Sequence, residues 1–217
     1  MTGNSDKLFV KICGITHPRQ AELTAAAGAD AIGLVFYPPS PRNVDVSLAR
    51  RIANAAAPVP CVGVFVNETP AKIIKTAQNL KLAAVQLHGN EPAEDAREIM
   101  GAGIKVIKFF RPDSLPLVDY PADVYLIEGS KGELPGGNGT VWNYHIPERF
   151  RKRAVLLAGG LGPDNLARAC EAALPDGVDA SSSLEIGPGI KDIKLVEKFI
   201  NSAKNLKINV PLRRILI

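Results

Sequence analysis

The sequence predicts a closed barrel of eight parallel strands, a fold of the α/β class. Short apolar runs rich in β-branched and aromatic residues alternate along the chain with segments of helical periodicity. Successive runs start about 24 residues apart, which is what one strand, one helix and two short loops need. Eight such units favour a (β/α)8 TIM barrel over a doubly wound sheet, which usually stops at about five or six strands. The predicted strands span residues 9–13, 31–35, 61–65, 84–87, 105–109, 124–128, 154–158 and 177–180.

Helix signals occupy the segments between these strands. In the first segment Thr16 or His17 stands at the N-cap, Pro18 lies in the first turn, and Gly28 marks the end. Residues 67–80 repeat the pattern, and residues 162–174 do so with Pro163 near the start. The segment 111–123 holds three prolines, so we expect only a short or irregular helix there.

The composition fits one barrel domain over residues 1–217, with 46% hydrophobic and 22% charged residues. Residues 207–217 form a C-terminal tail after the last helical pattern, and the sequence leaves their order open. The polar N-terminus has no apolar region typical of a secretory signal, and no apolar run reaches the length of a membrane helix. We therefore expect a protein that does not contact membranes.

Charge and cysteine content narrow the class of partner. The net charge of +4 suits an anionic small molecule, whereas a nucleic-acid binder usually concentrates its positive charge on one face. Three widely spaced cysteines, Cys13, Cys61 and Cys170, form neither a disulfide framework nor a metal-binding pattern. They fit a reducing cytoplasm. The sequence predicts a small-molecule enzyme that binds no nucleic acid and no metal.

Reactive side chains stand where a barrel enzyme would place them, at the carboxyl ends of the strands. Individually, Cys13 could be a small buried hydrophobe and His88 could cap a loop. Glu128 is harder to explain structurally, because a carboxylate that ends an apolar strand must be solvated, paired or perturbed. Their coincidence at one end of one barrel predicts a functional site. The candidates are Cys13, Arg42, Gln86, His88, Glu128 and Asp179.

The last third of the chain predicts a phosphate site. Glycine- or serine-rich loops cover residues 136–139, 159–165 and 181–185, each after a predicted strand. Glycines let backbone N–H groups approach an anion, and barrels often bind phosphate at the loops after strands seven and eight. Each loop alone could be a tight turn. The candidate residues are Gly137, Asn138, Gly139, Gly159, Gly160, Ser182 and Ser183.

Seven motifs, in this order, resemble the phosphoribosylanthranilate isomerase family of tryptophan biosynthesis: KICGIT, GLVFYPPSPR, VGVFVNE, VQLHGNE, GGNG, LAGGLGPDN and VDASSSLE. The resemblance covers about residues 7–206. It implies a (β/α)8 barrel without metal or cofactor that carries out an Amadori rearrangement. The substrate would be N-(5-phosphoribosyl)anthranilate and the product 1-(o-carboxyphenylamino)-1-deoxyribulose 5-phosphate, an aldose–ketose isomerisation. A monomer and a homodimer both stay open.

The resemblance also implies roles for single residues. Cys13 would be the general base that removes the proton from C2′ of the sugar, and Glu128 the general acid that protonates the ring oxygen. Arg42 would hold the anthranilate carboxylate, and the three glycine-rich loops would hold the phosphate. One group must start protonated and the other deprotonated, so their surroundings must separate their pKa values. The remaining candidates for substrate binding are Gln86, His88 and Asp179.

Lys11 lies two residues before Cys13, so strand alternation puts both side chains on one side, roughly 6.6 Å apart along the strand. A cation there would favour the thiolate, or Lys11 would pair with a carboxylate such as Asp179; the two roles are compatible.

Three positions depart from the family pattern: Glu128 replaces an aspartate, Ser183 replaces a glycine, and residues 140–144 read TVWNY instead of KTFDW. They leave two alternatives: an isomerase of another phosphoribosyl amine, and a phosphosugar-binding barrel with weakened catalysis. The presence of Cys13, Arg42, Gln86 and His88 argues against the second.

Overall fold

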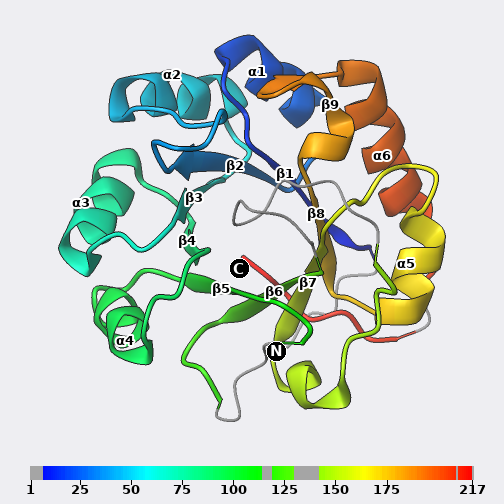
Figure 1. The fold of residues 1–217 in the computed structure, drawn as a ribbon. Helices are drawn as coiled ribbons and strands as arrows, with labels where there is room; N and C mark the ends of the chain where they lie inside the picture. Colours follow the sequence, from blue (N-terminus) through cyan, green and yellow to red (C-terminus); the bar gives the residue numbers. More distant parts are fainter. Residues whose placement is uncertain (1–6, 114–118, 130–141, 209, 217) are drawn as a thin grey trace.

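Eight parallel strands close into a barrel in the chain order β1 to β8 (Figure 1), which confirms the predicted fold. The computed structural model describes residues 7–113, 119–129, 142–208 and 210–216. Only β2 and β5 differ from the predicted bounds, each by one residue. The strands are β1 (Phe9–Cys13), β2 (Ala31–Phe36), β3 (Cys61–Phe65), β4 (Ala84–Leu87), β5 (Val106–Phe110), β6 (Val124–Glu128), β7 (Ala154–Ala158) and β8 (Gly177–Ala180).

Helices surround the barrel as an outer layer (Figure 1). As predicted, α1 begins at Pro18, and the His17 side chain caps it by accepting a hydrogen bond from the Arg19 N–H at 3.1 Å. In contrast, α5 begins at Leu166, three residues beyond Pro163. The described residues between β5 and β6 contain no helix. The helices are α1 (Pro18–Ala26), α2 (Val46–Ala56), α3 (Pro70–Leu80), α4 (Ala93–Gly101), α5 (Leu166–Ala173) and α6 (Ile193–Asn205), and a 3-10 helix, η1 (Glu148–Lys152), precedes β7.

A small hairpin after β8 was not predicted. A 3-10 turn, η2 (Ser182–Leu184), leads into β9 (Glu185–Gly187), which pairs antiparallel with β10 (Ile190–Lys191). Strands of two and three residues are too short to show alternation in the sequence. This hairpin places two charged side chains beside the pocket described below.

Strand alternation decides what fills the barrel. Every second side chain points inward, and the inner layers are apolar along most of the strand length. Lys11 and Cys13 share this inner side of β1, as the spacing predicts. The apolar interior consists of Ala31, Val62, Ala84, Ile107, Val124, Leu126, Ala154, Leu156, Ala158 and Ile215. In the described part of the chain, no helix combines the length and the apolar character needed to cross a membrane.

The C-terminal segment closes the barrel at the amino ends of the strands. The red segment in Figure 1 reaches the centre of the ring of strands. The Arg213 N–H donates to the carboxylate of Asp176, just before β8, at 2.7 Å. Ile215 is 4% exposed and packs against Gly177, where an added Cβ would lie 2.7 Å from its Cδ1. Described residues of the tail are thus part of the core.

Ile215→Ala is expected to lower the free energy of unfolding by about 2–5 kcal/mol, because it removes buried methyl groups and leaves a cavity at the barrel floor. Denaturant unfolding measures the change. Ile186, on β9, is 73% exposed, so Ile186→Ala serves as the matched control and should change stability by less than about 0.5 kcal/mol. Equal effects of the two substitutions would contradict a core role for Ile215.

Candidate active site

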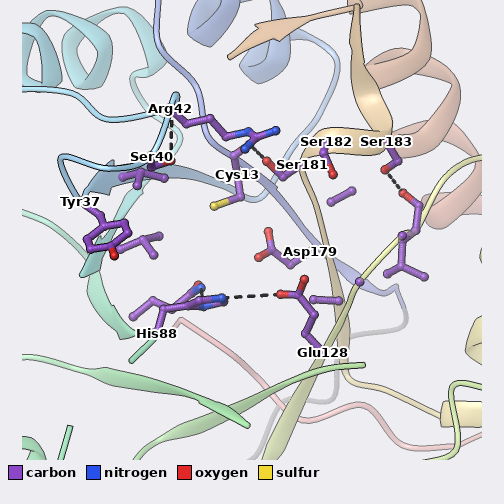
Figure 2. A pocket seen from close by; sticks show the side chains of 18 of the residues that line it. Cys13, Tyr37, Ser40, Arg42, His88, Glu128, Asp179, Ser181, Ser182 and Ser183 are labelled. Carbon is purple, nitrogen blue, oxygen red and sulfur yellow. Dashed lines mark hydrogen bonds and ion pairs between the residues drawn. The ribbon is translucent and has the colours of Figure 1, made fainter. Parts of the chain in front are cut away.

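One pocket lies at the carboxyl ends of the strands and collects side chains from most of them. Figure 2 shows Cys13, His88, Glu128 and Asp179 pointing into the same space. The predicted residues that line it are Cys13, Arg42, Gln86, His88, Glu128, Gly159, Gly160, Asp179, Ser182 and Ser183. Three further predicted phosphate residues, Gly137, Asn138 and Gly139, lie outside the described residues.

Cys13 is placed by two glycines. Its thiol lies over Gly33 of β2, where an added Cβ would stand only 2.6 Å from Sγ. The next residue, Gly14, has a φ of +76°, and an added Cβ there would stand 2.5 Å from Cδ of Arg42. A strand-end thiol followed by glycine therefore lets the chain turn while the aliphatic stem of Arg42 packs against the turn.

Burial governs the protonation of Cys13. It raises the pKa of the thiol above its ordinary value, while the positive charges of Lys11 and Lys191 oppose the shift. Lys11 Nζ donates to Asp179 Oδ2 at 2.8 Å, which confirms the predicted pair. The positive charge of Lys11 favours the thiolate, as expected, but burial outweighs it and the pKa of the thiol is raised overall. Within the described structure Asp179 Oδ1 has no hydrogen-bond partner, and Asp179 lines the pocket.

Glu128 ends β6 beside a neutral histidine. Burial, with the charges of Lys11 and Lys108, lowers the pKa of His88 to about 3, so the imidazole is uncharged at neutral pH. Its Nδ1 lies 2.8 Å from Gln86 Nε2, and its Nε2 lies 3.6 Å from Glu128 Oε2, too far for a direct hydrogen bond.

The extra methylene of Glu128 finds room at Gly159. A Cβ added to Gly159 would lie 3.0 Å from Glu128 Cγ and 3.1 Å from Nε1 of Trp142. Trp142 donates a hydrogen bond from Nε1 to the Ala158 carbonyl at 3.1 Å and packs on Gly129, where an added Cβ would meet its ring at 2.3 Å. Trp142 thus packs against Gly129 and close to Gly159, beside the strand end that carries Glu128, which the sequence motifs did not reveal.

The loops after β7 and β8 are joined through Ser183. Gly159 and Gly160 both have positive φ angles, +91° and +63°, which glycine adopts without strain. Asn165 Nδ2 donates to the Gly160 carbonyl at 2.8 Å and fixes this loop. The hydroxyl of Ser183 donates to the Leu161 carbonyl. Serine in place of glycine therefore ties the two predicted phosphate loops together.

Arg42 lies in the loop after β2 and is paired with Glu185, which in turn contacts Lys191. Sequence reasoning missed both partners as site residues. Glu185 closes the motif VDASSSLE, and its place after the last strand was an available signal. Lys191 gave none, because a lone lysine after a glycine–proline turn is usually solvated. No group of three or more His, Cys, Asp or Glu side chains in the described ranges is arranged to hold a metal ion.

The closed parallel barrel, with a thiol, a carboxylic acid and glycine-rich loops at one mouth, defines an acid–base enzyme of the (β/α)8-barrel class. A sequence model of N-(5'-phosphoribosyl)anthranilate (PRA) isomerase matches residues 10–202. The chain is 42% identical over 212 residues to the N-(5'-phosphoribosyl)anthranilate isomerase of Desulfatibacillum aliphaticivorans, covering 95% of this chain and 97% of the relative. The chain belongs to the N-(5'-phosphoribosyl)anthranilate isomerase family, as its motifs indicate.

Solved structures agree with this assignment. The phosphoribosyl anthranilate isomerase from Thermotoga maritima superimposes with a TM-score of 0.80 at 37% identity, over 92% of this chain and 100% of that chain. A second isomerase structure, in complex with reduced 1-(o-carboxyphenylamino)-1-deoxyribulose 5-phosphate, gives a TM-score of 0.76 at 35% identity with the same coverage.

Proposed function

We propose that this chain converts N-(5-phosphoribosyl)anthranilate into 1-(o-carboxyphenylamino)-1-deoxyribulose 5-phosphate in tryptophan biosynthesis, with Cys13 as general base and Glu128 as general acid. The observation that carries the proposal is the meeting of these two buried side chains at one pocket, from β1 and β6 (Figure 2). Three free, buried cysteines support a reducing cytoplasmic location.

The reaction follows from a proton donor and a proton acceptor on one sugar. Glu128 gives its proton to the ring oxygen, the bond from that oxygen to C1′ breaks, and the anthranilate nitrogen and C1′ form an iminium cation. Cys13, as thiolate, removes the proton from C2′, and the electron pair of that bond forms the C1′=C2′ double bond of an enolamine. C1′ then gains a proton as the C2′ hydroxyl loses one, which gives the aminoketose.

The raised pKa of Cys13 fits this order of steps. Burial disfavours the thiolate before the ring has opened. The iminium cation that forms on ring opening places a positive charge next to the C2′ proton, and a nearby positive charge favours a thiolate. Lys11 and Lys191 act in the same direction. Once the acid has acted, the thiol loses its own proton to solvent, and the thiolate that remains removes the C2′ proton.

The remaining predicted residues are assigned to binding. Arg42 holds the anthranilate carboxylate, and the unpartnered Asp179 Oδ1 accepts from a sugar hydroxyl. Gln86 and His88, whose side chains contact each other, form an uncharged surface of the pocket beside Glu128. Backbone N–H groups of the loops that hold Gly159, Gly160, Ser182 and Ser183 hold the phosphate, together with those of Gly137, Asn138 and Gly139.

A turnover assay tests the proposal. The purified chain is mixed with freshly prepared N-(5-phosphoribosyl)anthranilate, and the loss of its anthranilate-type fluorescence is followed while the product is identified by mass and chromatography. Catalysed formation of the aminoketose is expected. If the folded protein does not convert N-(5-phosphoribosyl)anthranilate but isomerises another phosphoribosyl amine, the substrate assignment is overturned. If it converts neither compound, the chain is a phosphosugar-binding barrel without this catalysis.

Arg42→Ala is expected to weaken binding of the reduced product analogue by roughly 1.5–3 kcal/mol, the contribution of a charge-assisted hydrogen bond. Binding of the phenylamino counterpart without the carboxylate should stay the same. Glu185 keeps Lys191 as a partner in the variant, so the fold should persist. Calorimetric titration of both ligands measures the difference, with the exposed Arg51→Ala as control. Equal weakening for both ligands would remove the assignment of Arg42.

A further inference from the structure

A carboxylate from the far end of the sequence holds Arg42 in place. Arg42 Nε donates to Glu185 Oε1 at 2.9 Å, and Nη2 donates to Glu185 Oε2 at 2.7 Å, across 143 residues of chain. The two side chains are only 12% and 4% exposed. A bidentate pair of this kind fixes the plane of the guanidinium. Nη1 takes no part in the pair and is the nitrogen that remains for a ligand.

This pair poses an electrostatic problem for ligand binding. Arg42 and Glu185 together form a neutral ion pair, which attracts the carboxylate of a ligand only weakly. Glu185 itself would repel an incoming anion. The pair is, however, joined by another cation. Lys191 Nζ donates to Glu185 Oε1 at 2.6 Å, and its side chain is fully buried. Arg42, Glu185 and Lys191 together therefore carry a net positive charge.

The surroundings of Lys191 fit an ammonium group. Besides Glu185, its Nζ donates to the Ser181 carbonyl at 3.1 Å and to the Ser181 hydroxyl at 3.3 Å, so each of its three N–H bonds has an acceptor. Ser181 Oγ donates onward to the Cys13 carbonyl at 2.9 Å. Burial lowers the pKa of Lys191, and Glu185 opposes that shift. One buried ammonium thus connects the arginine pair to the strand that carries the thiol.

We propose that Lys191 is a positioning residue for recognition of the substrate carboxylate. By sharing Glu185 with Arg42, it lets Glu185 fix the guanidinium while the positive charge of Arg42 stays available to the ligand. Lys191 itself acts through Glu185 and Arg42. The inference rests on the proposed function, in which Arg42 binds the anthranilate carboxylate.

Lys191→Met tests the inference, because methionine retains the length and apolar stem without the charge. Glu185 keeps both hydrogen bonds from Arg42 in this variant, so Arg42 becomes neutralised while it stays in place. We expect the dissociation constant of the reduced product analogue to rise on the order of 10- to 100-fold. The dissociation constant of the phenylamino counterpart should not change. Lys194→Met, an exposed lysine three residues further on, is the matched control and should bind both ligands as the wild type does.

A double-mutant cycle separates this role from general support of the fold. In a Glu185→Gln background, Lys191→Met should cause a much smaller loss of affinity for the carboxylated ligand, because no negative charge is left for Lys191 to share with Arg42. If Lys191→Met does not fold, Lys191→Gln replaces it, since glutamine keeps a hydrogen-bond donor without the charge. Equal weakening of both ligands, no weakening of either, or an undiminished effect in the Glu185→Gln background would each overturn the inference. A wild-type protein that binds neither ligand would instead overturn the proposed function.

Discussion

Cys13→Ser is expected to lower kcat by on the order of 10²–10⁴-fold while substrate binding is largely kept. The hydroxyl occupies nearly the same space above Gly33, but it is a far weaker acid than the thiol and cannot supply the anionic base. Steady-state kinetics with the phosphoribosyl substrate measure the loss. Cys170→Ser is the matched control, because Cys170 is buried in α5 and does not line the pocket; it should cost stability and leave kcat intact.

The pH dependence gives a second measure of the same role. The base acts as thiolate, and burial raises the pKa of Cys13, so in Glu128→Gln, where no acid has to stay protonated, the residual kcat/KM should increase with pH through the neutral range. This increase should disappear when Cys13→Ser is added to Glu128→Gln. A serine variant with near wild-type turnover, or a Glu128→Gln profile that falls from pH 7 to pH 9, would contradict the assignment of Cys13 as base.

The strands of the barrel are well predicted because the residues that indicate each strand lie within the strand itself and at its two ends. Each apolar run ends where a glycine, proline or polar cluster begins, and six of the eight predicted strands have the observed bounds. Alternation within β1 also places Lys11 on the inner side with Cys13, without knowledge of the tertiary structure. The start of α5 was misplaced because Pro163 can open a helix but does not have to, and here a turn precedes Leu166.

The site was only partly predictable, because protonation depends on burial. Lys11 beside Cys13 suggested a thiolate, but the pKa of a buried thiol also reflects every atom that excludes water, and those atoms come from several strands. Lys191 was missed for a similar reason. Lys191 is buried because a short hairpin packs against the loop after β8, and no residue pattern near Lys191 predicts that packing.

Glu128 is the proposed general acid, and two substitutions measure what a glutamate at this position contributes. The structure favours an adapted site: Gly159 leaves room for the Cγ atom, and Trp142 frames the strand end. Glu128→Gln is expected to lower kcat/KM by on the order of 10²–10⁴-fold, because an amide cannot protonate the ring oxygen. Glu171→Gln, at an exposed position of α5, is the matched control and should keep full activity.

Glu128→Asp is expected to reduce kcat/KM as well, by up to about 10²-fold. A general acid must lie within about 2.6–3.2 Å of the atom that it protonates, and the shorter side chain would draw the carboxyl group back from a position to which the pocket is fitted. The wild type and the two Glu128 variants are compared on the same substrate preparation. A markedly faster Glu128→Asp would show that glutamate is a handicap on this substrate and would favour an isomerase of another phosphoribosyl amine. Full activity of Glu128→Gln would exclude Glu128 as the acid and leave Asp179, already engaged by Lys11, as the next candidate.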